Sequence, residues 1–530
     1  MRRRRALTAA LAMTLVVAGC STDQDRTGGE PTAVSPETSM PADNVTILTE
    51  ENPAELALAI SQALYDRAPV VMLASAADTD GQQEAAATVA ETGVPMLVLG
   101  PGGDSAGADG SAALRDELTR LDAGTVLAVG DAAASWAGDL ELAVDVVPTD
   151  PSDGVAGAMA SAVPSPGVTP AAGTAAAAAA PVTVTAAEPL AGLAVLTPDT
   201  PHTVAAAATA RAAGARVLVT DAADPRTDPA LIEELSEQPP THTIALGAAF
   251  GPVETLRSRL EVVATGVQLP GGGQVVYPGR VMVALYGHPD TPVLGALGEQ
   301  PMEEAIARAK EVAAAYESLV DEPVVPTLEI ITTIAAASPG PEGDYSTRTP
   351  VSELEPWVQA AYEAGVYVVL DLQPGHTDFL TQAKEYEQLL VQPHVGLALD
   401  PEWRLAPDQR HMVHIGSVDA EEVNEVVEWL ADLTAAHALP QKLLVLHQFT
   451  LRMITNRDAV DTSRDEVAVL IHADGFGTHA QKFQTWNALL RNAPDGVWWG
   501  WKNFYDEDQP TMTPAETAAI DPLPRFISYQ

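Results

Sequence analysis

Cysteine is almost absent from this chain, and basic residues are scarce. Cys20 is the only cysteine among 530 residues, so no disulfide can form within the chain. The 28 lysines and arginines stand against 72 aspartates and glutamates, which gives a formal net charge of −44. An acidic surface repels nucleic acid and anionic lipid, so we expect no nucleic-acid partner. Neutral glycans, cationic groups and metal ions suit such a surface better.

Nucleotide-binding and nucleophile motifs are missing as well. The glycine-rich stretches at 100–103 and 271–273 lack the strand-to-helix context and the lysine of a phosphate loop. No G-x-S-x-G nucleophile elbow occurs. The sequence therefore predicts no bound cofactor.

Residues 1–19 have the pattern of a secretory signal peptide, in which four arginines precede an apolar run from Ala6 to Val17. That run is too short to cross a bilayer as a helix, and no other apolar run is long enough. The VAGC motif at 17–20 resembles the bacterial lipobox, which implies that Cys20 is lipidated and begins the mature protein. An ordinary cleaved signal with an incidental cysteine is the alternative. We expect an extracytoplasmic protein, lipid-anchored through Cys20 to the outer face of the cell membrane.

Two polar or low-complexity segments separate the other parts of the chain. Residues 20–44 are rich in proline, threonine and serine, which is the composition of a flexible tether. Residues 151–189 consist largely of proline, alanine, threonine and valine, and we interpret them as a linker.

The segments on either side of this linker, 45–150 and 190–270, look alike. ATVAETGVPMLVL at 87–99 lines up with ATARAAGARVLVT at 208–220, and apolar strand patterns precede and follow both stretches. This order predicts a small parallel sheet with helices on its faces. The units resemble the cell-wall-binding repeat family of surface proteins, whose G-x-P strand is matched from Gly93, and the resemblance implies attachment to the cell wall. A generic two-lobed α/β pair, such as a solute-binding fold, is the alternative.

From residue 275 to 530, apolar strands alternate with helical patterns. Near-continuous apolar strands indicate a parallel sheet buried on both faces, and about 250 residues suit a (β/α)8 barrel. A doubly wound open sheet is the alternative. The fold class is therefore α/β, with two small repeat units followed by a barrel-like domain. We expect strands at 281–290, 326–334, 366–375, 395–403, 442–450, 467–477 and 497–506, with 525–530 as a candidate eighth.

Polar residues follow most of these apolar runs, at the carboxyl ends of the strands. In a barrel these ends converge on one mouth, where such folds place their sites. Any one of these residues could be a solvated loop residue, but the repetition over six or seven strands favours a shared site. Aromatic side chains there, with Trp499, would offer flat apolar faces to sugar rings. The predicted substrate-binding residues are Tyr286, His288, Trp403, His447, Asp474, Trp501 and Lys502.

Asp400 and Glu402 form a pair of carboxylates at the end of one expected strand. Residues two apart in a strand point to the same face, so both would enter the mouth if the strand continued through Pro401. Glycoside hydrolysis needs one protonated and one charged carboxyl group. We predict Glu402 as the acid and Asp400 or Asp371 as its charged partner. The alternative is that Asp-Pro simply turns the chain.

The stretch VGLALDPEW, 395–403, is similar to the D-x-x-D-x-D-x-E motif on the fourth barrel strand of chitinase-like glycosidases. The match implies that Glu402 is the general acid and that Asp400 orients an acetamido group of the substrate. It also implies a polysaccharide or cell-wall glycan as partner. Val395 and Ala398 stand where the family has two further acids. The C-terminal region, including DPEWR and HADGFG, also resembles surface lipoproteins of high-GC Gram-positive bacteria, which implies no activity.

Two other functions fit the same residues. A non-catalytic protein would bind a glycan or another solute in the mouth without turnover, which the incomplete acidic motif favours. A metal-dependent hydrolase would hold a divalent ion through His447, His472 and Asp474, with His288 and Asp290 on the first strand. No spacing among these residues is diagnostic of a metal site, so we assign no metal ligand.

Overall fold

The computed structural model describes residues 32–100, 108–140, 145–149 and 182–530. The expected signal peptide, the lipidation motif at Cys20 and residues 151–181 of the expected linker lie outside these residues, whereas the last part of that linker contains a short strand at Val182–Val184. Within the described part of the chain, no helix is long and apolar enough to cross a membrane.

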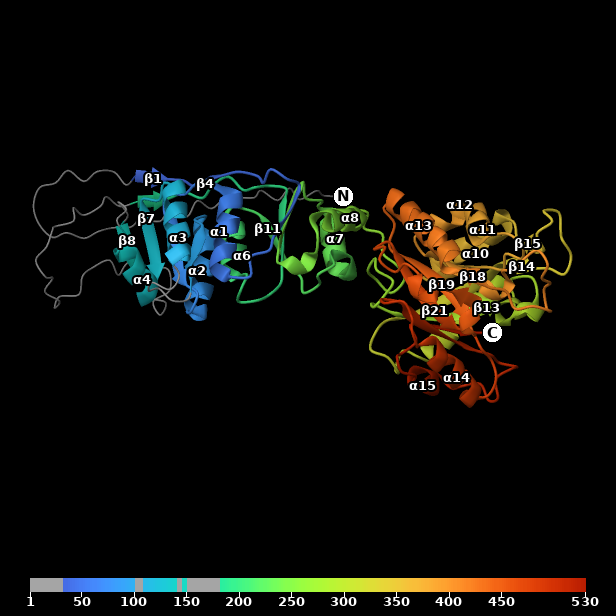
Figure 1. The fold of residues 1–530 in the computed structure, drawn as a ribbon. Coiled ribbons are helices and arrows are strands. Elements are labelled where there is room, and N and C mark those ends of the chain that lie inside the picture. The colour runs from blue at the N-terminus through green and yellow to red at the C-terminus, as the bar shows by residue number, and fades with distance from the viewer. Residues whose placement is uncertain (1–31, 101–107, 141–144, 150–181) are drawn as a thin grey trace, which may run out of the picture. The chain divides into compact units, whose positions relative to one another are not determined.

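The chain divides into two compact units (Figure 1). Unit 1 runs to Pro225 and takes in Gln238–Arg257, and unit 2 contains Arg226–Glu237 and Ser258–Gln530. Helix α7 (Pro229–Glu237) therefore belongs to unit 2, while the strands before and after it belong to unit 1.

Unit 1 contains two four-stranded parallel sheets of matching order, β6-β5-β7-β8 and β11-β10-β12-β3. The first strand of this set in the chain, β3, pairs with the last, β12. The segment 190–270 therefore supplies three of the four strands of the second sheet. The strands are β3 (Val45–Leu48), β5 (Val70–Ser75), β6 (Met96–Leu99), β7 (Thr125–Val129), β8 (Asp145–Thr149), β10 (Leu193–Thr197), β11 (Arg216–Val219) and β12 (His242–Leu246).

Alanine-rich helices join the two sheets of unit 1. Helix α6 packs against both α1 and α2, and its buried side chains are six alanines and Thr209. Such small side chains let helices approach closely. Thr209 also accepts a hydrogen bond from the Met96 N–H at 2.9 Å and donates one to the Met96 carbonyl at 3.1 Å, which ties α6 to strand β6. The helices are α1 (Pro53–Leu64), α2 (Thr79–Thr92), α3 (Ala108–Arg120), α4 (Asp131–Gly138) and α6 (Val204–Ala212).

Unit 2 is a closed barrel of eight parallel strands, in the order β13-β23-β22-β21-β19-β17-β16-β14, and pairing between β13 and β14 closes it. The seven expected strands and the candidate eighth all participate, which confirms the barrel over the open sheet. Short β15 (Ser346–Arg348) pairs antiparallel with the end of β14. The barrel strands are β13 (Val281–Gly287), β14 (Val324–Ala335), β16 (Tyr367–Leu372), β17 (Val395–Leu399), β19 (Lys442–Gln448), β21 (Val467–Ala473), β22 (Trp498–Asn503) and β23 (Phe526–Tyr529).

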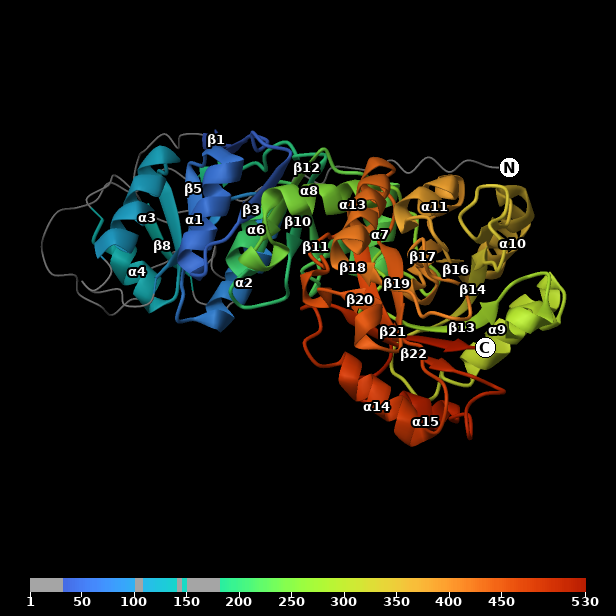
Figure 2. The ribbon, with the colours of Figure 1, turned by 45° about the vertical axis from the view of Figure 1, so that its right-hand side comes forward.

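Helices cover the outside of the barrel. Figures 1 and 2 show α10 to α13 grouped on one side of the strands and α14 with α15 on another. Outward-facing strand residues such as Val368, Leu397 and Leu444 form the main core with them. Side chains of Thr478 and Thr513 complete capping boxes that begin α14 and α15. The helices are α9 (Met302–Ala314), α10 (Val351–Ala364), α11 (Phe379–Glu385), α12 (Glu387–Leu390), α13 (Ala420–Ala436), α14 (His479–Leu489) and α15 (Pro514–Ala518). Helix α8 (Val253–Ala264) begins in unit 1 and ends in unit 2.

Three further pairs of short strands complete the fold. They are β1 (Thr32–Val34) with β9 (Val182–Val184), β2 (Glu37–Thr38) with β4 (Tyr65–Arg67), and β18 (Val418–Asp419) with β20 (Ile454–Thr455).

An apolar layer fills the barrel interior. Because successive strand residues alternate between two faces, every second residue points inward. Inward residues that form this layer include Ala284, Val369, Val445, Leu470 and Phe526. The next inward position along each strand, toward its carboxyl end, begins the site.

Candidate functional site

A polar layer lies directly above the apolar layer of the barrel. Its members are two residues further along their strands, so the same alternation points them inward. All of them are buried, and most have no exposed surface. They are Tyr286, Glu329, Asp371, His447, His472, Lys502 and Ser528.

His447 lies at the centre of this polar layer. Its Nε2 is 2.8 Å from Glu329 Oε1, and its Nδ1 is 2.9 Å from Asp474 Oδ2. Asp371 Oδ1 lies 3.9 Å from the same Nε2. Burial lowers the pKa of His447, but the charge of Glu329 and the hydrogen bond with Asp474 outweigh burial and raise it well above its ordinary value. These neighbours therefore favour the protonated form of His447.

Lys502 contributes the second positive charge. Its Nζ lies 3.5 Å from Asp474 Oδ1 and 3.5 Å from the centre of the Tyr286 ring. Such a cation–π contact is favourable in a dry site. The Tyr286 hydroxyl in turn donates a hydrogen bond to Asp371 Oδ2 at 3.0 Å. Both cations thus lie among the carboxylates at the top of the barrel.

The stretch after β17 forms a turn, so the expectation that the strand continues through Pro401 is wrong. Strand β17 ends at Leu399, and Pro401–Trp403 is a single 3₁₀ turn. The Asp400 side chain caps this turn by accepting a hydrogen bond from the Glu402 N–H at 3.3 Å. Proline lacks an N–H and has a fixed φ, which suits the first position of a turn. The alternative interpretation, a turn, is correct, but both carboxylates still line the cleft described next.

The mouth of the barrel holds a cleft of about 630 Å³. Asp400, Glu402, Asp474 and Lys502 supply its charged groups. Its aromatic lining is Tyr286, Trp403, Phe449, Phe476 and Phe504. The Trp403 ring also packs on His411, with ring centres 5.1 Å apart. An apolar cleft with a few convergent polar groups is the usual form of a ligand site.

Two carboxyl groups in this cleft have pKa values shifted in opposite directions. Burial raises the pKa of Glu402 to about 7, and the negative charge of Asp474 adds to that shift. Burial alone would raise the pKa of Asp474 too, but Lys502 and His447 outweigh burial and hold it well below its ordinary value. Glu402 is therefore substantially protonated near neutral pH, while Asp474 is ionised.

The other two predicted acids differ from Asp474. Burial raises the pKa of Asp371 to about 6, with the charge of Glu329 adding to the shift. Burial also raises the pKa of Asp400 well above its ordinary value, partly with the charge of Asp371. Asp371 is not among the residues that line the cleft. Neither group is as well suited as Asp474 to carry a stable negative charge.

Three predicted binding residues lie away from the cleft. His447 is buried beneath it. His288 is buried beside β13 and contacts the Thr349 hydroxyl at 3.1 Å. Trp501 is 1% exposed and packs on Trp486, because it alternates with the inward-facing Lys502 and so points toward the helices.

Trp499 shares the outward direction of Trp501 and also packs on Trp486. The expectation that these two tryptophans face a sugar is therefore not met. Their alternation with Lys502 is visible in the sequence and could have excluded them. Conversely, Phe449, Phe476 and Phe504 line the cleft without having been predicted. They lie in loops after strands, where no periodicity marks an inward residue.

His472 and the buried carboxylates retain unpaired polar atoms. Among the described residues, Glu329 Oε2, Asp371 Oδ1 and His472 Nδ1 are buried without a hydrogen-bond partner. Burial lowers the pKa of His472 well below its ordinary value, and the positive His447 lowers it further, so His472 is neutral. Its Nε2 is 3.2 Å from the Ser528 hydroxyl.

The proposed metal ligands do not form a coordination group in the described part of the chain, where no cluster of three suitable side chains occurs. Both ring nitrogens of His447 already face carboxylate oxygens.

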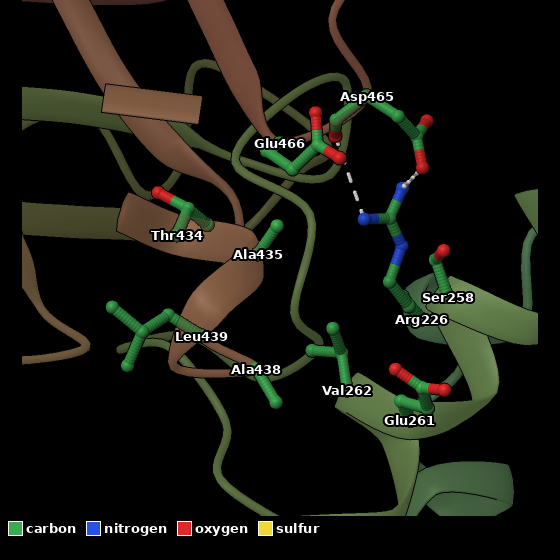
Figure 3. Close-up of a pocket in the computed structure, with 10 residues that line it drawn as sticks. All are labelled: Arg226, Ser258, Glu261, Val262, Thr434, Ala435, Ala438, Leu439, Asp465 and Glu466. Atoms are coloured by element: carbon green, nitrogen blue, oxygen red, sulfur yellow. Dashed lines mark hydrogen bonds and ion pairs between the residues drawn. The ribbon is translucent and has the colours of Figure 1, made fainter. Parts of the chain in front are cut away.

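A second, smaller cavity of about 50 Å³ lies at the amino ends of the barrel strands (Figure 3). Arg226 contacts Asp465 there, with Nη2 and Oδ2 2.8 Å apart. Arg259 holds the same carboxylate through two hydrogen bonds of 3.0 and 2.8 Å. In barrels this face contributes stability rather than chemistry. The cavity is therefore part of the packing of Arg226 and the second half of α8 within unit 2.

Comparisons with known proteins give little guidance. No family model matches the chain, and no curated protein matches it. One similar solved structure is Cwp6 from Clostridium difficile, at 13% sequence identity and a TM-score of 0.31, with 69% of this chain and 66% of that chain covered. The chain thus spans slightly less than two thirds of the length of that protein. A TM-score this low does not indicate a shared fold, so any functional assignment depends on the residues of the site.

Proposed function

We propose that the barrel cleft binds a polysaccharide and hydrolyses a glycosidic bond, with Glu402 as general acid and Asp474 as its charged partner. The observation that supports this proposal is the opposite shift of the two pKa values within one cleft. Two carboxyl groups held in different protonation states are what glycoside hydrolysis requires. Asp474 thus takes the role of charged partner that the sequence analysis gave to Asp400 or Asp371.

The proposed chemistry follows from the two protonation states. As the bond between the sugar C1 and the leaving oxygen breaks, the Glu402 carboxyl group gives its proton to that oxygen. Asp474 stabilises the positive charge that develops at C1. Water then adds its oxygen to C1 as the new hydroxyl group, and its other proton passes to the Glu402 carboxylate, which restores the acid. Trp403 and Phe476 offer apolar faces against which a sugar ring can pack.

The test uses the full chain and four polysaccharides: bacterial cell wall, chitin, cellulose and laminarin. Release of reducing ends should fall at least about a hundredfold in Glu402→Gln, because the proton donor is lost. Asp474→Asn should show a similar loss. Exposed Glu425→Gln and Asp495→Asn are matched controls that should retain full activity. Unchanged turnover in Glu402→Gln on every glycan that the native protein cleaves would refute the assignment.

A binding function without turnover is the second candidate. The positions that hold two further acids in the chitinase-like motif are Val395 and Ala398, both fully buried in β17. If the protein only binds, one of the four polysaccharides should retain it without releasing reducing ends. Trp403→Ala should then weaken retention, since Trp403 lines the cleft. Turnover that depends on Glu402 would contradict this candidate.

We also propose that the protein is a cell-surface lipoprotein whose unit 1 holds it at the cell wall. The VAGC motif at 17–20 supports the lipid anchor, and the repeated units support wall binding. Radiolabelled palmitate should label the full chain in a bacterial host, and Cys20→Ala should abolish labelling. Separately, purified cell walls should retain the full chain, and Trp403→Ala, which alters the barrel cleft, should not weaken that retention. Unlabelled native protein would exclude the anchor, and failure of walls to retain the full chain would exclude the second role.

A further inference from the structure

Two carboxylates from strands far apart in the sequence meet on the single ring of His447. Asp474 follows β21 and faces Nδ1, while Glu329 is on β14 and faces Nε2. The imidazole has no exposed surface, and neither does Glu329. Since water cannot reach the ring, its hydrogen bonds must be satisfied by these two groups.

Ionised carboxylates can only accept hydrogen bonds. A ring that faces two of them satisfies both only if both nitrogens carry a proton. A neutral ring would place one nitrogen lone pair against a carboxylate oxygen, and repulsion between them in a buried site is costly. The positive ring also compensates two buried negative charges, which would otherwise be strongly unfavourable.

The neighbouring charged groups favour the same state. Asp371 is on β16, and its Oδ1 lies 3.9 Å from Nε2 of His447. Asp400 lies nearby, directly after β17. Two further cations act on Asp474: Lys502, on β22, lies 3.5 Å from its Oδ1, and Lys482, on α14, interacts with it through charge. His472 packs edge-on against His447 with ring centres 5.0 Å apart and carries no charge. Tyr286 of β13 also lies edge-on, 6.0 Å from the ring centre.

Both oxygens of Asp474 are consequently held by cations. Oδ2 is 2.9 Å from His447 and Oδ1 is 3.5 Å from Lys502. Asp474 and Lys502 line the cleft, whereas His447 does not. His447 therefore acts on a bound ligand through its hydrogen bond to Asp474, while its charge also lowers the pKa values of Asp400 and Glu402 in the cleft.

We infer that His447 is a positioning residue, a buried imidazolium that fixes the orientation and the negative charge of Asp474 by donating hydrogen bonds to Asp474 and Glu329 at once. The role of Asp474 in catalysis rests on the proposed function, but the protonation of His447 does not. The two can be tested separately.

The first experiment measures the ring itself, without a ligand. In the full chain labelled with ¹⁵N-histidine, the resonances lost in His447→Gln identify this ring. Both nitrogens should have the chemical shifts of an imidazolium at pH 7, above the ordinary histidine pKa. A neutral ring at pH 7, with one unprotonated nitrogen, would overturn the inference whatever the cleft does.

The second experiment uses the pH profile of kcat/KM on whichever of the four polysaccharides is cleaved. Without His447, Asp474 loses one of the two cations that contact it, so the pKa of Asp474 rises. The acid limb of the kcat/KM profile then moves to higher pH. At a pH on that limb, the kcat/KM of His447→Gln should be about tenfold or more below its own maximum value. His394→Gln is the matched control, because His394 is also buried but hydrogen-bonds only a backbone carbonyl, that of Val358. It should lower stability and leave the limb in place.

A double variant covers the case in which His447→Gln does not fold. His447→Gln with Glu329→Gln removes the carboxylate that would otherwise be buried without its cation. It should fold and still show the displaced acid limb. An unmoved limb in a folded variant would refute the positioning role. If Glu402→Gln retains turnover while the ring is an imidazolium, the proposed function fails and the inference about His447 stands.

Discussion

Replacing Glu402 by glutamine should stabilise the barrel above pH 7 and leave its stability nearly unchanged at pH 4.5. The folded protein raises the pKa of Glu402 from 4.5 to about 7, with burial as the main cause. Between these two values the folded state binds more protons than the unfolded state, so its stability falls as the pH rises. At 1.36 kcal/mol per pKa unit, the native carboxyl group costs up to about 3 kcal/mol above pH 7. Glutamine imitates the protonated form and avoids this cost.

Urea unfolding followed by tryptophan fluorescence measures the effect in the appropriate unit, because seven of the eight tryptophans lie after residue 350. Native protein and Glu402→Gln are compared at pH 4.5 and at pH 8. Exposed Glu425→Gln should show no pH-dependent difference. If Glu402→Gln gives the same stability difference at both values, Glu402 is not held protonated by the fold, and its assignment as the acid loses its physical basis.

Three other predictions concern packing. Gly500→Ala should lower the free energy of unfolding by about 1 to 3 kcal/mol, because the new Cβ would lie 2.4 Å from His472 Cδ2; thermal unfolding measures this. Burial lowers the pKa of Lys442 from 10.5 to about 7, so the unfolded state binds more protons between these values and native stability rises with pH. The free energy of unfolding of Lys442→Met relative to the native protein should therefore fall by about 1.4 kcal/mol per pH unit in that window. Urea titrations at two pH values measure this change, and a constant difference would contradict the prediction. Thr209→Val leaves the buried polar groups of Met96 unpaired and should destabilise unit 1 by about 1 to 3 kcal/mol, whereas an unchanged unfolding midpoint by circular dichroism would exclude that role.

The barrel was predictable because local sequence patterns indicate each of its strands and helices. Each apolar run is long enough to be a strand, and helical patterns separate the runs. The inward direction of Lys502 and the outward direction of Trp501 also follow from local alternation, once one inward residue of β22 is known. The sequence therefore contains most of the polar layer.

The pairing inside that layer was not predictable. His447 meets Glu329 across 118 positions, and no local pattern indicates which strand ends face each other across a barrel. The division of roles between Asp474 and Asp371 depends on the neighbouring cations, which are known only from the fold. Asp400 illustrates a third limit, because a carboxylate that caps a turn and a carboxylate in a cleft have the same sequence pattern, and here one residue is both.

The pairing of β3 with β12 has consequences for the folding of this protein during synthesis and for its response to proteolysis. During synthesis from the N-terminus, β3 is made before its partner β12, and all strands of the first sheet are made between them. Folding of the second sheet thus depends on a contact of long sequence separation, which slows folding. A proteolytic cut after Leu48 would leave β12 as a bare edge strand, and such edges recruit other chains into aggregates. The two sheets share no strand, but they cannot be separated by dividing the chain in two.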